Sequence, residues 1–82
     1  MASSVAQQKQ AIKAFLISTG WTEDRFGHLH KTMSGVKLRF KFGKLTLRFE
    51  NQHHVGDKPH WFCRRSGYYS KITIKDGKLV GI

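Results

Sequence analysis

Basic and apolar residues alternate through the middle of the chain. In residues 36–42 and 45–49 every second residue is apolar, and the residues between are mostly Lys or Arg. Such alternation is typical of β-strands with one buried and one exposed face. A row of cations on an exposed face favours an anionic polymer as ligand, because each Lys or Arg can contact one phosphate. The exposed positions predicted to carry these cations are Lys37, Arg39, Lys41 and Arg48.

Residues 61–69 contain a second group of candidate binding residues. Two cations and two aromatic rings flank the turn-forming pair Ser66-Gly67. Exposed rings stack on bases while arginines follow the phosphates, a combination suited to single-stranded nucleic acid. The alternative is that Trp61, Phe62 and one tyrosine complete the core. The candidates in this segment are Arg64, Arg65, Tyr68 and Tyr69.

Histidines and a cysteine between residues 53 and 63 raise the question of a metal site. His53, His54, His60 and Cys63 lie close together in sequence, and zinc accepts both imidazole and thiolate ligands. Structural zinc sites usually contain paired cysteines, whereas this chain has one cysteine. We therefore expect no metal and no other cofactor. Cys63 is expected to be a small core residue, and His53 and His54 to be loop residues.

The chain offers few groups for catalysis. Its five carboxylates are scattered without the spacing of a catalytic pair, and neither a phosphate-binding glycine loop nor a nucleophile elbow is present. One enzyme class remains as an alternative, a metal-free ribonuclease in which His28 or His30 transfers protons beside phosphate-binding cations. Neither histidine has a carboxylate that the sequence places to orient it. We therefore expect a binding module without enzyme activity.

One segment resembles a known family of ribonucleases. A helix expected before Gly20-Trp21, followed by Gly27-His28-Leu29-His30, resembles the first part of HicA-type toxin ribonucleases, which place a histidine on the strand after such a helix. The resemblance covers about a quarter of the chain and implies ribonuclease activity carried by a strand histidine. The chain lacks the adjacent Gly-Ser-His-His form of that family, and no C-terminal helix is expected.

An N-terminal helix is predicted from Val5 to Thr19. Ser4 and Gln7 have the spacing of a capping box, and Gly20 can close the helix in a Schellman motif. The apolar side of this helix is formed by Val5, Ile12, Phe15 and Leu16.

A β-hairpin is predicted around Gly43-Lys44, a pair that suits a two-residue type II′ turn. This register places Phe40 opposite Leu47 on one face and Arg39 opposite Arg48 on the other. A like-charge pair directly across two strands costs stability, and an anionic ligand would relieve the repulsion. The hairpin therefore supports the prediction of an anion-binding face.

The preceding run extends this hairpin through a turn at Ser34-Gly35. The resulting register places Leu29 opposite Phe40. His30 then lies beside Arg39 and His28 beside Lys41, so both histidines join the candidate binding residues. Lys31 falls on the apolar face, where its ammonium group must reach water past the edge of the sheet.

The rest of the chain is expected to form a loop over residues 51–59, then strands over 61–65 and 68–75. Asp76-Gly77 is a type I′ turn signal that pairs Ile74 with Leu79, and the tail over residues 79–82 is expected to fray. The predicted fold is therefore α+β, with one N-terminal helix packed on a five- or six-stranded antiparallel meander. The expected helix contacts join Phe15 and Leu16 to Leu38, Phe40, Leu47 and Phe49.

Length, net charge and cysteine content exclude several classes of protein for this chain. The 82 residues are expected to form a single domain over residues 1–82 without a linker. The net charge of +10 excludes an acidic mimic of DNA and points to polyanionic partners. A single cysteine excludes an intramolecular disulfide framework and favours the cytoplasm, and no secretory signal or membrane span is recognised.

The leading interpretation is a small module that binds DNA or RNA. One alternative is the ribonuclease described above. A second is an inhibitor, of the kind carried by phages and other mobile elements, that docks onto an acidic or nucleoprotein host complex. The chain is expected to be a monomer or a homodimer paired through an edge strand.

Overall fold

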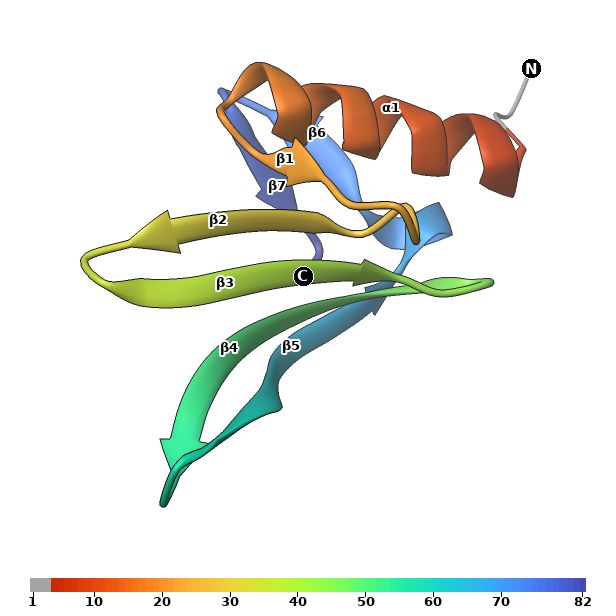
Figure 1. Ribbon diagram of the computed structural model, residues 1–82. Coiled ribbons are helices and arrows are strands. Elements are labelled where there is room, and N and C mark those ends of the chain that lie inside the picture. Colours follow the sequence, from red (N-terminus) through yellow and green to blue (C-terminus); the bar gives the residue numbers. More distant parts are fainter. Residues whose placement is uncertain (1–3) are drawn as a thin grey trace.

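The computed structural model describes residues 4–82 and has an α+β architecture (Figure 1). The first five strands form one antiparallel sheet in chain order, and the last two form a separate hairpin. The elements are α1 (Val5–Ser18), β1 (Thr22–Glu23), β2 (Leu29–Met33), β3 (Val36–Phe42), β4 (Thr46–Val55), β5 (Lys58–Tyr68), the 3₁₀ turn η1 (Tyr69–Lys71), β6 (Thr73–Lys75) and β7 (Lys78–Val80). The predicted fold class is confirmed.

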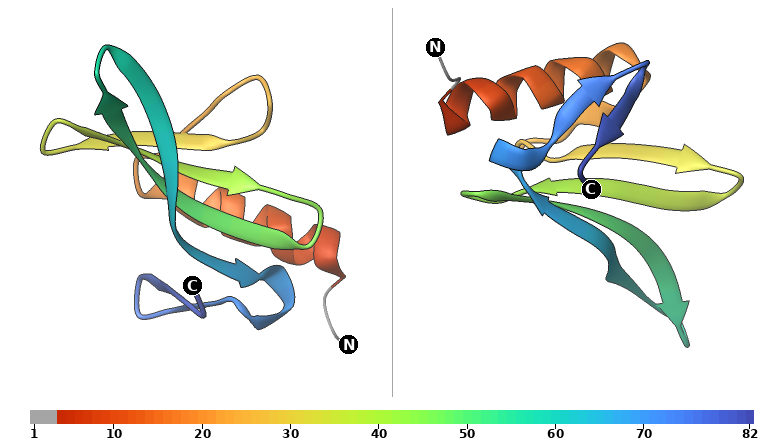
Figure 2. Two further views of the ribbon diagram at one scale, coloured as in Figure 1. Left: turned by 90° about the horizontal axis from the view of Figure 1, so that it is seen from below. Right: turned by 180° about the vertical axis from the view of Figure 1, so that it is seen from behind.

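The sheet has two distinct faces. Seen from below in Figure 2, the sheet lies in front of α1, and in the view from behind the β6–β7 hairpin lies beside that helix. We call the face toward α1 the inner face and the opposite one the outer face. No helix within residues 4–82 is long and apolar enough to cross a membrane.

Both ends of α1 have the predicted caps. The Ser4 hydroxyl accepts the amide N–H of Gln7 at 3.1 Å, and the Gln7 side chain accepts the Ser4 N–H at 2.9 Å. At the other end Trp21 N–H donates to the Leu16 carbonyl at 3.1 Å, with Gly20 at φ +103° between them. This is the Schellman closure, which uses the positive φ that glycine tolerates.

The predicted β2–β3 register is confirmed. Leu29 pairs with Phe40, His30 with Arg39 and Lys31 with Leu38, through a turn at Ser34-Gly35 with positive φ at both residues. The Lys31 ammonium donates to the Thr19 carbonyl at 3.0 Å. A cation at the C-terminal end of a helix is favourable, which explains how a lysine is tolerated on the inner face.

The predicted β3–β4 register is wrong by two residues. Phe42 pairs with Leu47 and Phe40 with Phe49, so the connection is longer than the expected two-residue turn, and Gly43 does not take a positive φ. Tyr69 holds the wider loop, because its N–H donates to the Leu45 carbonyl at 3.1 Å and its hydroxyl to the Gly43 carbonyl at 2.8 Å. A shift of two keeps every side chain on its predicted face.

The expected loop over residues 51–59 is also wrong. β4 continues to Val55, the chain turns at Gly56-Asp57, and β5 runs without interruption to Tyr68. One register shift next to Phe49 and Glu50 marks a β-bulge in this pair of strands. The β4–β5 pair extends away from α1 as an arm of the sheet (Figure 1).

The core lies where α1 crosses the inner face. Its buried residues are Ile12, Leu16, Leu29, Phe40, Phe42, Leu47, Tyr69 and Ile72. The expected helix contacts are partly wrong, because Ile12 is buried with Leu16, while Phe15 is only partly buried. Leu38 lies further along β3, opposite Asn51 and outside this cluster.

The C-terminal hairpin forms at Asp76-Gly77, as predicted. Ile74 pairs with Leu79, and both residues of Asp76-Gly77 have positive φ. The tail does not fray as expected, since Leu79 and Ile82 pack against the core. A methyl group on Gly67 would lie 2.5 Å from the Gly81 carbonyl oxygen, so these two glycines permit the close approach of tail and sheet.

Candidate nucleic-acid interface on the outer face

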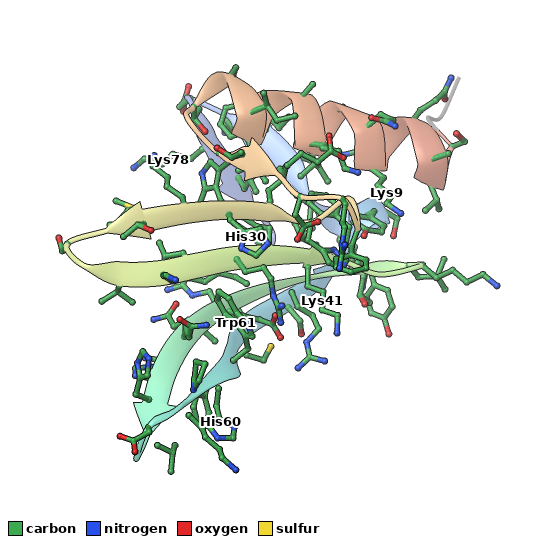
Figure 3. All side chains as sticks on the ribbon, viewed as in Figure 1. Lys9, His30, Lys41, His60, Trp61 and Lys78 are labelled. Carbon is green, nitrogen blue, oxygen red and sulfur yellow. The ribbon has the colours of Figure 1, made fainter. Side chains whose placement is uncertain are left out.

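The outer face gathers most of the predicted binding residues in neighbouring cross-strand rows. One row runs from His30 through Arg39 and Glu50 to Cys63. In the next row Lys41 lies opposite Arg48. Figure 3 shows His30, Lys41 and Trp61 over strands β2 to β5. The sheet thus brings together cations from two strands and an aromatic ring from a third.

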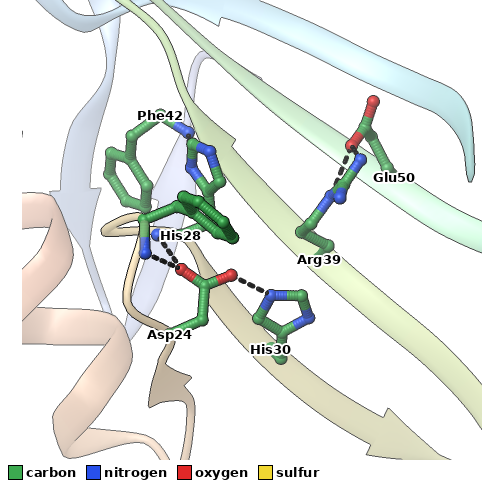
Figure 4. Close-up of polar contacts among 7 residues, drawn as sticks. Asp24, His28, His30, Arg39, Phe42 and Glu50 are labelled. Atoms are coloured by element: carbon green, nitrogen blue, oxygen red, sulfur yellow. Dashed lines mark hydrogen bonds and ion pairs between the residues drawn. The ribbon is translucent and has the colours of Figure 1, made fainter.

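Arg39 is bound by Glu50 rather than left free. Its Nε donates to Glu50 Oε1 at 2.8 Å, and its Nη2 binds the same oxygen (Figure 4). Glu50 is only 4% exposed, so its carboxylate depends on this partner. The predicted pairing of Arg39 with Arg48 is therefore wrong, because the shifted register places a carboxylate opposite Arg39.

The like-charge pair on this face is formed by Lys41 and Arg48. Both side chains are exposed and lie on directly paired positions. Arg48 forms a longer ion pair with Glu50, whose Oε2 lies 3.7 Å from Arg48 Nε, while Arg39 binds the other oxygen, Oε1. The observed register thus also places two cations on directly opposed positions of this face, with Lys41 in place of the predicted Arg39.

Asp24 orients His30, a contact that the sequence did not reveal. Asp24 Oδ1 accepts the amide N–H groups of Phe26 at 2.8 Å and His28 at 2.9 Å, while Oδ2 lies 2.6 Å from His30 Nε2 (Figure 4). Burial opposes ionisation of Asp24, but the bonds from His30 and the two amides outweigh it and lower the pKa of this carboxyl. An ionised Asp24 accepts a proton-bearing Nε2, which fixes the imidazole.

A local signal for this contact was present in the sequence. Asp24 and Gly27 are the first and fourth residues of a turn, the positions where Asp and Gly are favoured. The turn aims the Asp24 side chain at the amides that follow it. The strand after the turn then places His30 beside Asp24 Oδ2, the carboxylate oxygen that accepts no backbone amide.

His28 has a structural role. Its Nδ1 accepts the amide N–H of Phe42 at 3.1 Å, which ties the start of β2 to the end of β3. The pKa of His28 is lowered first by burial and then by the positive charges of Arg39, Lys41 and His30, against the opposing charge of Asp24. His28 is therefore held neutral, with Nδ1 as an acceptor, and is not available as a cationic phosphate ligand.

Acid is expected to weaken the fold through His28. Because its folded pKa lies below the usual 6.5, the unfolded chain binds more protons there, and stability present above that value is lost as the pH falls. His28→Asn replaces Nδ1 with an amide oxygen that does not titrate. We expect the melting temperature of wild type to fall more than that of His28→Asn between about pH 7 and pH 5.

His54→Asn is the matched control, because His54 is an exposed residue near the end of the β4–β5 arm. This variant should show the pH dependence of wild type. Identical pH dependence in wild type and His28→Asn would contradict the structural role of His28.

The aromatic residues exposed on the outer face are not the ones predicted. Tyr69 is fully buried, and burial raises the pKa of its hydroxyl to about 12, so its predicted contact with a base is wrong. Tyr68 lies on β5 opposite Thr46 and is 55% exposed. Trp61, a core residue under the alternative interpretation, lies on the outer face with Arg39 stacked on its ring at 4.2 Å. Tyr68 and Trp61 are therefore the rings that this face can offer.

Trp61 could have been placed from the sequence only through the β4–β5 register. Once Gly56-Asp57 is taken as a hairpin turn, Trp61 falls opposite Gln52, on the face of Arg48 and Glu50. Lys37 lies on the same face of β3 as Arg39 and Lys41, further along the strand and opposite Thr32. Arg64 and Arg65 do not belong to this face, because they line a groove on the inner side of the sheet.

The histidines of the β4–β5 arm pair across the strands. His53 lies opposite His60, and its ring packs edge-on against Phe62 with a centroid distance of 5.4 Å. Cys63 is exposed, so its expected place in the core is wrong, and its thiol lies 3.4 Å from the Arg65 carbonyl oxygen. Within residues 4–82 no group of three or more His, Cys, Asp or Glu side chains is arranged to hold a metal ion.

No protein-family model matches the chain, and neither a curated protein nor a solved structure is found to be similar to it.

Proposed function

We propose that the outer face of the sheet binds single-stranded nucleic acid without catalysis. The observation that carries this proposal is the exposed Lys41–Arg48 pair, two like charges on directly opposed positions of neighbouring strands. Such a pair costs stability in the free protein, and a phosphate between the two side chains would turn that repulsion into attraction.

The charge balance of the face supports an anionic ligand. Lys37, Arg39, Lys41 and Arg48 give +4, and Glu50 gives −1, so the net charge is +3. Because Arg39 is bound to Glu50, the cations available to phosphates are Lys37, Lys41 and Arg48. This local excess accompanies a net charge of +10 over the whole chain, which adds long-range attraction to a polyanion.

The aromatic residues favour a single strand over a duplex. Tyr68 is 55% exposed and Trp61 partly exposed on the same face as the cations. Bases in a duplex are stacked on each other, whereas the bases of a single strand can stack on protein rings. Arg39 stabilises the Trp61 ring by cation–π contact, which reduces the entropy lost when a base binds.

The salt dependence of binding tests this proposal. With three phosphate contacts, log affinity should fall against log salt with a slope near −2.1 for a single strand (about 0.7 × 3) and −2.7 for a duplex (about 0.9 × 3). Fluorescence anisotropy with labelled oligonucleotides measures both slopes. Lys41→Ala should make the single-strand slope shallower by about 0.7, while Tyr68→Ala should weaken single-strand binding by about 1–3 kcal/mol with little change in slope.

Lys9→Ala, on α1 and away from the outer face, is the control and should behave as wild type. Absence of binding to either oligonucleotide at low salt would contradict the proposal. That result would favour the alternative partner, an acidic protein surface.

A second candidate function is favoured by the Asp24–His30 contact. A carboxylate 2.6 Å from an imidazole nitrogen orients that ring, as a general base or acid requires. The neighbouring cations could hold the phosphate of an RNA strand. After transfer of the 2′-hydroxyl proton to His30, the 2′-oxygen would bond to phosphorus as the P–O5′ bond breaks. The leaving 5′-oxygen would take its proton from water, because His28 is engaged by Phe42.

Incubation of fresh protein with RNA at neutral pH separates the two candidates. The binding module leaves the RNA intact. A ribonuclease would cleave it, and His30→Ala would abolish cleavage while leaving most of the binding. Cleavage that survives His30→Ala would exclude this histidine as the catalytic group.

A further inference from the structure

A groove of about 780 Å³ lies on the inner side of the sheet, apart from the outer face. It is bounded by the C-terminal half of α1, the inner faces of β3 and β4, the bulged part of β5 and the β6–β7 hairpin. The hairpin lies beside α1 on this side of the sheet (Figure 2). The groove is thus formed where the helix and the hairpin leave part of the inner face uncovered.

The lining of the groove is rich in aromatic rings. Phe40 contacts Trp21 with a centroid distance of 4.7 Å and Phe49 with a distance of 5.1 Å. All three residues line the groove. Phe40 is buried beneath the groove, and the partly exposed rings of Trp21 and Phe49 are the apolar surface on which a planar ligand can stack.

Three cations also line the groove: Arg64, Arg65 and Lys78. The ion pairs formed within residues 4–82 include none of these three side chains. Their charges come from two separate segments, the bulged strand β5 and the start of β7. Cations from two elements that line one groove without a carboxylate partner favour an anionic ligand.

Asn51 adds a polar group to this apolar lining. Its Oδ1 is buried, and among the buried side-chain oxygen and nitrogen atoms of residues 4–82 it alone has no hydrogen-bond partner. Asn51 lines the groove beside the aromatic residues. A buried acceptor without a donor is unfavourable in the free protein, and a ligand that brings an N–H group removes this cost.

We propose that this groove binds one nucleotide. The base lies against the aromatic residues and donates an N–H to Asn51 Oδ1, and the phosphate is held by Arg64, Arg65 and Lys78. The aromatic residues thus match the base ring, Asn51 matches an N–H at the edge of the base, and the three cations match the charge of the phosphate. The nucleotide is either free in solution or the phosphorylated end of a strand, and the site is independent of the outer face.

Titration with AMP, followed by calorimetry, tests the proposal. AMP should bind, while adenosine and ribose 5-phosphate should each bind at least about tenfold more weakly, since each lacks one half of the recognition. A 5′-phosphorylated adenine oligonucleotide identifies the source of the ligand. Competition between this oligonucleotide and AMP for the groove indicates a strand end, and failure to compete indicates a free nucleotide.

Asn51→Leu gives two effects of opposite sign. Replacing the unpartnered amide by an apolar side chain of similar size should raise the melting temperature of the free protein. The same change should weaken AMP binding about tenfold, because the base loses its acceptor. A higher melting temperature with unchanged AMP affinity would show that Asn51 is no part of a ligand site.

Lys78→Ala tests the phosphate end and should weaken AMP binding about tenfold. Lys9→Ala is the control, since Lys9 and Lys78 lie toward opposite ends of α1 in Figure 3. Lys41→Ala, on the outer face, should leave AMP binding unchanged, so failure of the groove and failure of the outer face are distinguishable. Equal loss in Lys78→Ala and Lys9→Ala, or binding of an acidic peptide in the groove without binding of AMP, would overturn the proposal.

Discussion

Phe40→Ala is expected to lower the free energy of unfolding by about 3–5 kcal/mol. Phe40 is 7% exposed, packs between Trp21 and Phe49, and belongs to the same buried cluster as Leu16 of α1. A domain of this size is stable by only about 3–5 kcal/mol. The variant should therefore be largely unfolded.

Circular dichroism during thermal and urea unfolding measures this loss. Val36→Ala is the control on the same strand and the same face, because Val36 is 38% exposed and lies outside the core. We expect that variant to lose less than about 1 kcal/mol. Unfolding of Phe40→Ala at the wild-type temperature would contradict the assignment of the inner face.

Arg39→Ala is expected to cost about 3 kcal/mol, because it leaves the Glu50 carboxylate buried without its main partner. Glu50 is 4% exposed, and its remaining cationic neighbour is Arg48, 3.7 Å away. The hairpin register expected from the sequence implies the opposite sign, since removing one of two facing arginines would relieve repulsion. The sign of this single effect therefore distinguishes the two registers.

Lys41→Ala is the matched control for Arg39→Ala. It removes one cation from the same strand and face, but from the like-charge pair, so stability should change by no more than about 0.5 kcal/mol or rise slightly. In a Glu50→Gln background the cost of Arg39→Ala should shrink, because no buried charge is left unpaired. Equal stability of Arg39→Ala and wild type would argue against the Arg39–Glu50 ion pair.

Features set by neighbouring residues could be predicted from the sequence. The capping box at Ser4, the Schellman closure at Gly20 and the turns at Ser34-Gly35 and Asp76-Gly77 are each determined within a few positions. The strand alternation in β3 and β4 assigned side chains to the correct faces. The assignment of faces is correct despite the register error, because a shift of two residues keeps each side chain on the same face of the sheet.

Features set by distant contacts could not be predicted. The length of the β3–β4 loop depends on Tyr69, which binds the carbonyls of Gly43 and Leu45 from more than twenty residues away. The β4–β5 arm was taken for a loop because it extends beyond the core, and residues exposed on both faces need not alternate. The β4–β5 register places Trp61 on the outer face, and the β3–β4 register pairs Glu50 with Arg39, so both contacts were missed.

The most direct test of the proposed interface compares two double variants of equal charge. Lys41→Glu with Arg48→Glu reverses the pair on the outer face, and Lys9→Glu with Lys75→Glu reverses two cations on α1 and β6. Each changes the net charge by −4, from +10 to +6, so long-range attraction falls equally. We expect the outer-face variant to lose single-strand binding at low salt and the other variant to keep most of it. Equal weakening in both variants would mean that binding follows net charge and not this face, and would contradict the proposed interface.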